Sequence, residues 1–257
     1  MITSIYYSLP YELRRFLYAK IKSKSFRLLQ TQRSIVTDSD YSLKPYVQNK
    51  CIFIHIPKSA GVSICRTLFN NLAGGHQDIK LYQIVFSKKE FDSYFKFTFV
   101  RNPWDRLFSA YNFLKKGGMN DSDRVWASEN LSEYVSFDDF VKKWLTIANT
   151  NKHMHFAPQY KMLCLPSSDN IDVDFLGFYE NIQDDFIYIK NQLSLSADLE
   201  LKYENKTESN DRQFDYRNCY TDEARDIVSQ VYKKDIDLLG YNYDNSSLKK
   251  QLAHRPT

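Results

Sequence analysis

One short stretch of the chain combines a lysine, a glycine and two serines within seven residues. It covers residues 57–63 and reads PKSAGVS. When such a loop opens a helix, the backbone N–H groups and the helix N-terminus converge on one point and can bind an anion. Lys58 would add a full positive charge there, and Ser59 and Ser63 would add hydroxyl groups. The stretch therefore predicts a phosphate-binding loop.

The order of its residues separates this loop from the Walker A motif of ATPases and GTPases. That motif, GxxxxGK[ST], has its lysine directly after the second glycine, whereas Lys58 precedes Gly61. A P-loop ATPase or GTPase is therefore disfavoured. Taken by itself, the stretch is explained equally well as an ordinary turn between a strand and a helix.

An arginine and a serine in a second stretch form another candidate anion site. Residues 99–111 read FVRNPWDRLFSAY and contain Arg101 and, eight positions later, Ser109. Pro103 suits the first turn of a helix, which would place Ser109 about two turns into that helix. An arginine at the end of a strand can bind a phosphate through two parallel hydrogen bonds. Two such sites predict one ligand with two separated anionic groups.

Both stretches follow a short run of apolar residues. Residues 51–56 are apolar except for His55, and residues 97–100 read FTFV. Runs of this kind suit strands that are buried on both faces, as in a parallel sheet. Two consecutive units of strand, loop and helix predict an α/β fold of the P-loop-like, three-layer type, with a central parallel sheet flanked by helices.

Together the two motifs resemble the cofactor motifs of sulfotransferases that use 3′-phosphoadenosine 5′-phosphosulfate (PAPS). The closer likeness is to the branch that holds carbohydrate O-sulfotransferases and many bacterial homologues, and it extends over roughly residues 51–243. Later segments also fit: HFAPQ from His155, VDFLGFYENI from Val173 and YKKDIDLLGY from Tyr232. The resemblance implies that Arg101 and Ser109 hold the 3′-phosphate. It also implies that the 5′-phosphosulfate is cradled by Lys58, Ser59, Ala60, Gly61, Val62 and Ser63.

The activity implied by this resemblance is transfer of a sulfuryl group from PAPS to a hydroxyl group of a carbohydrate, either a polysaccharide or a glycolipid. Adenosine 3′,5′-bisphosphate (PAP) would be the other product. In-line transfer needs a base for the hydroxyl proton and a cation for the leaving phosphate, and no metal ion is expected. Lys58 is the candidate cation. Two alternatives stay open: a nucleotide kinase of related architecture, and a non-catalytic protein that binds nucleotides or glycans.

Histidine is the natural candidate for the base, because its unperturbed pKa is about 6.5. His76 follows two glycines, and the resemblance implies a catalytic histidine in a similar region. His155 is the second candidate, as a base or as an acceptor-binding residue, whereas His55 lies inside an expected strand and is given a structural role. Lys206 lies in a late loop that closes over the nucleotide in similar enzymes, and it would add positive charge there.

The length of 257 residues suits one α/β domain. We expect a basic amphipathic segment over residues 1–33, a linker over 34–49, the sulfotransferase domain over 50–245 and a tail over 246–257. Late in that domain, the pattern predicts a third strand over residues 175–179, a helix over 182–193 and a final helix that Thr221 caps and that ends at Leu239.

Positive charge is concentrated at the start of the chain. Residues 1–33 hold seven basic side chains and one acidic one, or +6, which leaves −2 for the rest because the whole chain carries +4. One face of the predicted helix is apolar: Leu9, Leu13, Phe16, Leu17 and Ile21. Such a helix can lie on an anionic membrane surface or a membrane-bound partner, or it can pack against the domain. Nucleic-acid binding is not favoured, because the rest of the chain is slightly acidic.

No run of residues approaches the ~20 apolar positions of a membrane span, and no apolar signal-peptide core precedes a small-residue cleavage site. The resemblance implies that eukaryotic relatives are anchored in the Golgi by such a span. We therefore expect either a bacterial enzyme in the cytoplasm, peripheral at the inner face of the membrane if residues 1–33 bind lipid, or a chain from which such a span has been trimmed.

Overall fold

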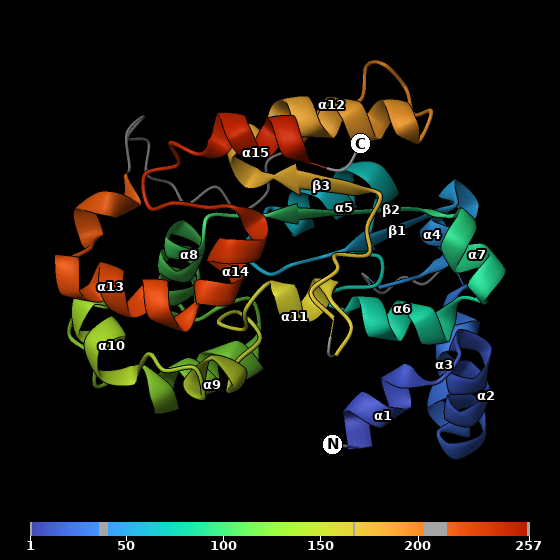
Figure 1. Cartoon of the computed structure of the whole chain (residues 1–257), viewed down its shortest axis with the longest axis horizontal. Helices are drawn as coiled ribbons and strands as arrows, with labels where there is room; N and C mark the ends of the chain where they lie inside the picture. Colours follow the sequence, from blue (N-terminus) through green and yellow to red (C-terminus); the bar gives the residue numbers. More distant parts are fainter. Residues whose placement is uncertain (1, 36–40, 167, 203–214, 256–257) are drawn as a thin grey trace.

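The structure, a computed structural model, describes residues 2–35, 41–166, 168–202 and 215–255. Within these ranges the chain forms a parallel sheet of three strands in the order β1-β2-β3. The strands are β1 (Cys51–Ile54), β2 (Phe95–Val100) and β3 (Phe175–Phe178). Helices flank the sheet, so the predicted α/β fold with a central parallel sheet is confirmed (Figure 1).

Aromatic side chains line one face of the sheet, and all three strands are buried on both faces. Phe53 of β1 pairs with Phe97 of β2, and their rings stack with centroids 4.9 Å apart. Phe97 in turn pairs with Phe175 of β3. The buried polar side chain of Thr98 is accommodated in β2, because its hydroxyl donates a hydrogen bond of 2.7 Å to the Ile54 carbonyl of β1.

Helices cover both faces of the sheet. In Figure 1, α12 (Ile182–Gln192) and α15 (Leu248–His254) lie on one face, and α6 (Ile79–Val85) and α11 (Tyr160–Leu163) lie on the other. The remaining helices of this part are α4 (Lys44–Asn49), α5 (Gly61–Phe69), which follows β1, and α7 (Lys88–Ser93), which precedes β2.

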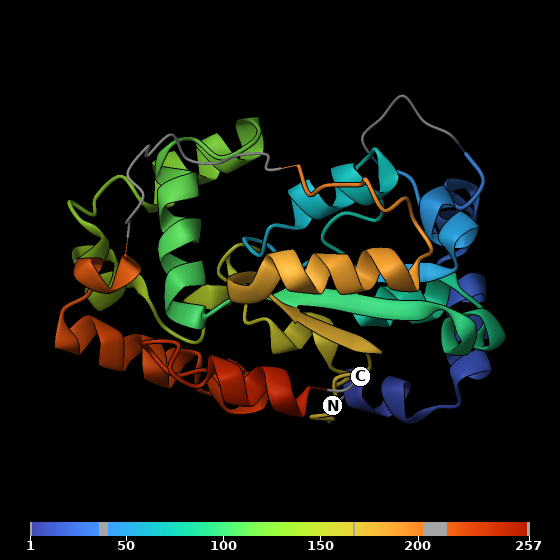
Figure 2. The ribbon, with the colours of Figure 1, turned by 90° about the horizontal axis from the view of Figure 1, so that it is seen from above.

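A second group of helices stands beside the sheet and has its own aromatic core (Figures 1 and 2). Its centre is formed by Phe140, Trp144, Phe156 and Tyr232, all buried. The helices are α8 (Pro103–Lys115), α9 (Asp121–Asn130), α10 (Phe137–Trp144), α13 (Asp222–Val231) and α14 (Lys233–Leu239). Short 3-10 turns cover Asn149–Asn151, Tyr179–Asn181 and Tyr216–Cys219.

Two sequence-based expectations differ from the structure. The final helix predicted from Thr221 to Leu239 is divided at Tyr232, whose buried hydroxyl donates a hydrogen bond of 2.7 Å to the Phe156 carbonyl. Residues 44–49 of the expected linker form α4, because Tyr46 is an apolar core residue whose hydroxyl reaches the Phe53 carbonyl at 2.8 Å.

The N-terminal segment folds into α1 (Ile2–Ser8), α2 (Tyr11–Ile21) and α3 (Ser23–Gln32), of which α2 and α3 pack against α6. Three of its side chains donate to the end of α6: Arg14 to the Gln83 side chain at 2.8 Å, Arg15 to the Ile84 carbonyl at 3.1 Å and Gln30 to the Val85 carbonyl at 2.8 Å. Packing on the domain is thus the arrangement found for this segment. Across the four described ranges, every helix is too short or too polar to span a lipid bilayer.

Candidate functional site

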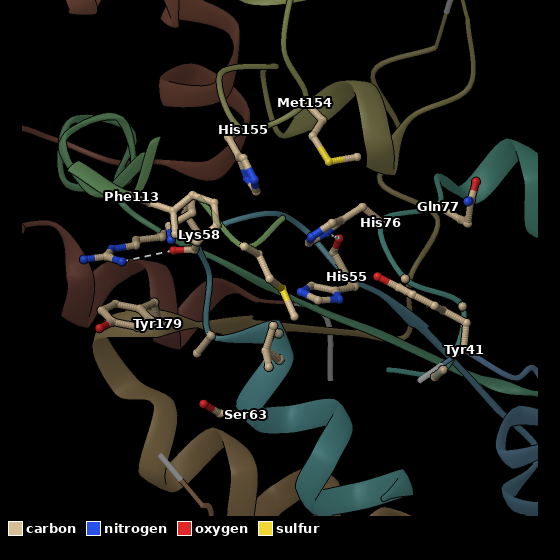
Figure 3. Close-up of a pocket in the computed structure, with 18 of the residues that line it drawn as sticks. Tyr41, His55, Lys58, Ser63, His76, Gln77, Phe113, Met154, His155 and Tyr179 are labelled. Atoms are coloured by element: carbon tan, nitrogen blue, oxygen red, sulfur yellow. Dashed lines mark hydrogen bonds between the residues drawn. The ribbon is translucent and has the colours of Figure 1, made fainter. Parts of the chain in front are cut away.

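A cavity of about 1100 Å³ opens where β1 and β2 end and the two groups of helices meet. Figure 3 shows Lys58 and Tyr179 at one end of the cavity, Tyr41 and Gln77 at the other, and His55 and His76 between them. Most of the sequence-predicted site residues line this one cavity: Lys58, Ala60, Gly61, Val62, Ser63, His76, Arg101, Ser109 and His155. The exceptions are Ser59 and Lys206, and Lys206 lies outside the described residues.

The loop between β1 and α5 has the backbone geometry of an anion cradle. Lys58 and Ala60 adopt positive φ angles of 69° and 61°, a region that residues other than glycine seldom occupy. Alternation of this kind turns successive N–H groups toward one point. Ala60 is also the N-cap of α5 and has no side-chain acceptor for the N–H groups of the first turn. Behind the loop, the buried Ser59 hydroxyl has no hydrogen-bond partner.

Gly61 is required by the close approach of His55. A Cβ atom at this position would lie 1.8 Å from Cδ2 of the His55 ring. His55 is buried and its ring centroid is 4.0 Å from that of His76. The glycine therefore allows the loop to lie directly against the pair of histidines.

Lys58 is poised between its charged and neutral forms. Its Nζ lies 3.8 Å from the centroid of the Phe113 ring. Burial, together with repulsion from Arg101, lowers the pKa of Lys58 to about 7, although Asp123 acts in the opposite direction. An anion that enters the cavity would restore the charge of this lysine.

Arg101 connects the two predicted motifs. Its Nη1 donates a hydrogen bond of 3.0 Å to the Lys58 carbonyl, and its guanidinium lies 4.0 Å from the centroid of the Tyr179 ring. Its Nε and Nη2 bind both carboxylate oxygens of Asp105 at 2.8 Å. The two parallel bonds that we expected for a phosphate are therefore made to Asp105 in the first turn of α8, and a phosphate would have to share or replace this partner.

Gln159 fixes the backbone of Arg101, a role that the sequence did not reveal. The Gln159 side chain accepts from the Arg101 N–H at 3.0 Å and donates to the Arg101 carbonyl at 2.8 Å. The backbone N–H groups of Gln159 and Tyr160 donate to the buried Asp235 carboxylate, each at 2.8 Å. One signal in the sequence could have pointed to these two residues. Gln159 lies in the HFAPQ segment and Asp235 in the YKKDIDLLGY segment, and both segments are part of the family resemblance.

His76 has the hydrogen bond that a general base needs. Its Nδ1 lies 2.9 Å from the His55 carbonyl oxygen. A carbonyl oxygen can only accept a hydrogen bond, so Nδ1 carries the proton of the neutral ring, and Nε2 keeps the lone pair that can take up a proton. Burial lowers the pKa of His76, and Lys58 lowers it further, against the opposing effect of the hydrogen bond to His55. The ring is therefore neutral at pH 7.

His155 has a different environment. Burial, reinforced by His76 and Lys58, lowers the pKa of His155 to about 2, and its Nδ1 is buried without a hydrogen-bond partner. Its ring packs edge-on against Phe113, with centroids 4.8 Å apart. A ring of such low basicity is a poorer proton acceptor than His76.

The N-terminal segment contributes part of the cavity wall. Leu29 and Gln32 of α3, with Tyr41 and Leu43 after it, line the end far from Lys58. The sequence leaves residues 1–33 open between a membrane surface and the domain and predicts a linker over 34–49, without placing either segment at the site. The amphipathic pattern of a helix indicates that one face is covered, but it does not indicate which surface covers it.

Comparison with known proteins decides the family. The family model described as "Sulfotransferase family" matches residues 47–242. The chain belongs to this sulfotransferase family. The match spans the sheet, the cavity loop and both predicted motifs, so the family resemblance seen in the sequence is confirmed.

Several proteins of known sequence are similar to parts of this sulfotransferase-family chain. Carbohydrate sulfotransferase 14 of Danio rerio is 33% identical over 37% of this chain and 29% of its own length. Carbohydrate sulfotransferase 11 of Rattus norvegicus is 27% identical over 64% of this chain and 51% of its own length. An uncharacterised protein of Archaeoglobus fulgidus is 29% identical over 49% of this chain and 89% of its own length. No solved structure matches this chain.

The chain therefore spans between 29% and 51% of the length of these two carbohydrate sulfotransferases. The prediction of a cytoplasmic location is wrong. It relied on the absence of a membrane span and of a signal peptide, whereas these two relatives are vertebrate carbohydrate sulfotransferases, the group for which the resemblance implies a Golgi membrane enzyme.

Proposed function

We propose that this chain transfers a sulfuryl group from PAPS to a hydroxyl group of a carbohydrate. The observation that carries the proposal is that two anion-binding elements, the Lys58 loop and Arg101, meet at a 3.0 Å hydrogen bond in the cavity that also contains the neutral His76 ring. A donor with two separated anionic groups suits this pair of sites.

The residues present fit the 5′-phosphosulfate group. The left-handed backbone at Lys58 and Ala60 and the uncapped first turn of α5 leave N–H groups that can bind an anion in the cavity. Ser59 stays a proposed contact through its place in this loop, although its side chain does not line the cavity. When bound, PAPS would supply the sulfuryl group and leave as PAP. Arg101 and Ser109 are the proposed contacts of the 3′-phosphate, with Arg101 shared between that phosphate and Asp105.

His76 and Lys58 are the proposed catalytic residues. His76 accepts the proton of the acceptor hydroxyl at Nε2, while its Nδ1–H stays bonded to the His55 carbonyl. Lys58 carries positive charge at the leaving phosphate, and it is held over Phe113 in a position shielded from water. Lys206 remains a proposed cofactor contact only.

A carbohydrate is the proposed acceptor class because the named relatives are carbohydrate sulfotransferases. A polysaccharide and a glycolipid both meet this description. The kinase alternative receives no support from the family match.

Two measurements test this function. PAP should raise the melting temperature of the protein by several degrees while ATP at the same concentration does not, because only PAP has phosphates at both ends of the ribose. Transfer of labelled sulfate from PAPS to a panel of glycans, proteins and small alcohols should label a glycan. A shift with ATP alone, or label only on a protein or alcohol, contradicts the proposal.

A further inference from the structure

A second hollow adjoins the cavity on its far side from Lys58. It has a volume of about 280 Å³ and shares His76, Gln77 and Leu81 with the main cavity. Figure 3 shows Gln77 beyond His76, on the side away from Lys58. A molecule with a hydroxyl at the His76 ring can therefore extend into this hollow without leaving the protein surface.

Three tyrosines of the N-terminal helices form the outer wall of the hollow. They are Tyr6 and Tyr7 of α1 and Tyr18 of α2, which we call the tyrosine subsite. All three are half-buried. They lie outside residues 47–242, the part of the chain that the family model matches. The wall is thus an addition of this chain's N-terminal segment.

The positions of the Tyr6 and Tyr7 rings are fixed before any ligand binds. The Tyr6 hydroxyl donates a hydrogen bond of 2.7 Å to the Arg14 carbonyl, and the Tyr6 and Tyr7 rings pack edge-on with centroids 5.1 Å apart. The Arg14 guanidinium lies 5.3 Å from the centroid of Tyr7 and is itself held by the Gln83 side chain. Rigid aromatic surfaces of this kind lose little conformational entropy when a ligand binds.

The hollow has no net charge to attract an ionic ligand. Its two charged side chains, Asp78 and Lys80, form an ion pair of 2.7 Å. Asp78 also caps α6 through the Leu81 N–H, and Lys80 donates to the Lys161 carbonyl at 2.9 Å. Burial, with the nearby Asp78, raises the pKa of Tyr7 to about 12, so its hydroxyl stays a neutral donor.

Flat aromatic faces edged with hydroxyl groups fit a sugar ring, which has apolar C–H faces and a polar rim. We propose that the tyrosine subsite binds a sugar unit next to the one that is sulfated, so that the acceptor is a saccharide chain rather than a single sugar or a small alcohol. This inference rests on the proposed function and goes beyond it by naming chain length as the property that the N-terminal segment recognises.

The test compares acceptors of different length in the wild-type chain and in four variants of the full chain. The probes are monosaccharides, disaccharides and hexasaccharides of hyaluronan, chondroitin and chitin, with labelled sulfate transfer as one readout and saturation-transfer NMR of the free sugars as the other. Tyr18→Ala and Tyr7→Ala remove part of the subsite. Phe16→Ala is the matched control, because this ring on α2 is 56% exposed and lines neither hollow.

In the wild-type chain, KM should fall as the acceptor grows from one unit to six. Each tyrosine variant should raise the KM for the hexasaccharide by about tenfold, the usual effect of truncating a buried aromatic contact, and should reduce the NMR signal of its bound sugar. In the tyrosine variants, the KM for the monosaccharide and the affinity for PAP should be unchanged. The Phe16→Ala variant should behave like the wild-type chain in every measurement.

Sulfate transfer that is independent of acceptor length, or that neither tyrosine variant affects, would overturn the subsite and leave the proposed function intact. Absence of transfer to every saccharide would overturn the proposed function, and the subsite with it. Tyr7→Phe keeps the ring and separates a loss of stacking from a loss of the hydroxyl.

Discussion

The guanidinium of Arg101 donates a hydrogen bond of 3.0 Å to the backbone carbonyl of Lys58, although 43 positions separate the two residues. The contact follows from the sheet, since β1 and β2 are parallel neighbours and their carboxyl ends lie side by side. One nucleotide with phosphates on both sides of its ribose can thus reach both residues.

Replacing Arg101 should discriminate between the two phosphates of such a nucleotide. We expect Arg101→Gln to weaken PAP binding by about 10- to 100-fold, since hydrogen bonds to a charged group contribute about 1.5–3 kcal/mol. Binding of AMP, which lacks the 3′-phosphate, should change much less. Isothermal titration calorimetry measures both, with the exposed Arg124→Gln as the control. An equal loss for PAP and AMP would place Arg101 elsewhere on the ligand.

Lys58 should take up a proton when PAP binds. Its pKa of about 7 in the free protein rises when an anion lies beside it, so at pH 8 a mostly neutral lysine becomes charged. Affinity should therefore fall as the pH rises above 7. Calorimetry at pH 8 in two buffers of different ionisation enthalpy should show an uptake of close to one proton. The uptake should disappear in Lys58→Met, and an unchanged uptake in that variant would assign the proton to another group.

His76 should be far more important for turnover than His155. We expect His76→Ala to lower kcat by about 10²- to 10⁴-fold, the usual contribution of a placed base, with the thermal shift by PAP retained. His155→Ala should cost much less. Because the pKa of His76 is lowered, the acidic fall of kcat/KM, as the base becomes protonated, should lie below the ordinary histidine value of about 6.5. The alkaline fall above pH 7 belongs to Lys58. The opposite ranking of the two variants would assign the base to His155.

Gly61→Ala should damage the site through His55. The added methyl group would meet the His55 ring at 1.8 Å and push it toward His76, so kcat should fall together with the melting temperature. Gly240→Ala is the control for the loss of stability that comes from backbone strain alone. The φ angle of Gly240 is 74°, which is strained for alanine, and the residue lies at the end of α14, outside the cavity lining. This control should lower stability and leave turnover per folded molecule unchanged. Full activity in Gly61→Ala would show that the histidine pair tolerates displacement.

Some of these features were predictable because they depend on neighbours in the chain. The apolar runs before Pro57 and Arg101 indicated buried strands, and the turn residues after them indicated loops that open helices, which is what β1 to α5 and β2 to α8 form. Parallel pairing then followed from general rules of α/β folds. The sequence also predicted the fold class and, through its two motifs, the family.

Only the tertiary structure decided which distant groups meet. It paired Arg101 with Asp105 as well as with the Lys58 carbonyl, fixed the Arg101 backbone through Gln159, and turned Nδ1 of His76 toward the His55 carbonyl. It also decided that the N-terminal helices, for which the sequence left a membrane surface or the domain as the partner, pack on the domain, where residues of α3 line the cavity. The physical reason is that secondary structure follows from local periodicity and turn chemistry, whereas these contacts depend on how separately formed elements pack, and no local pattern encodes the partner of a buried face.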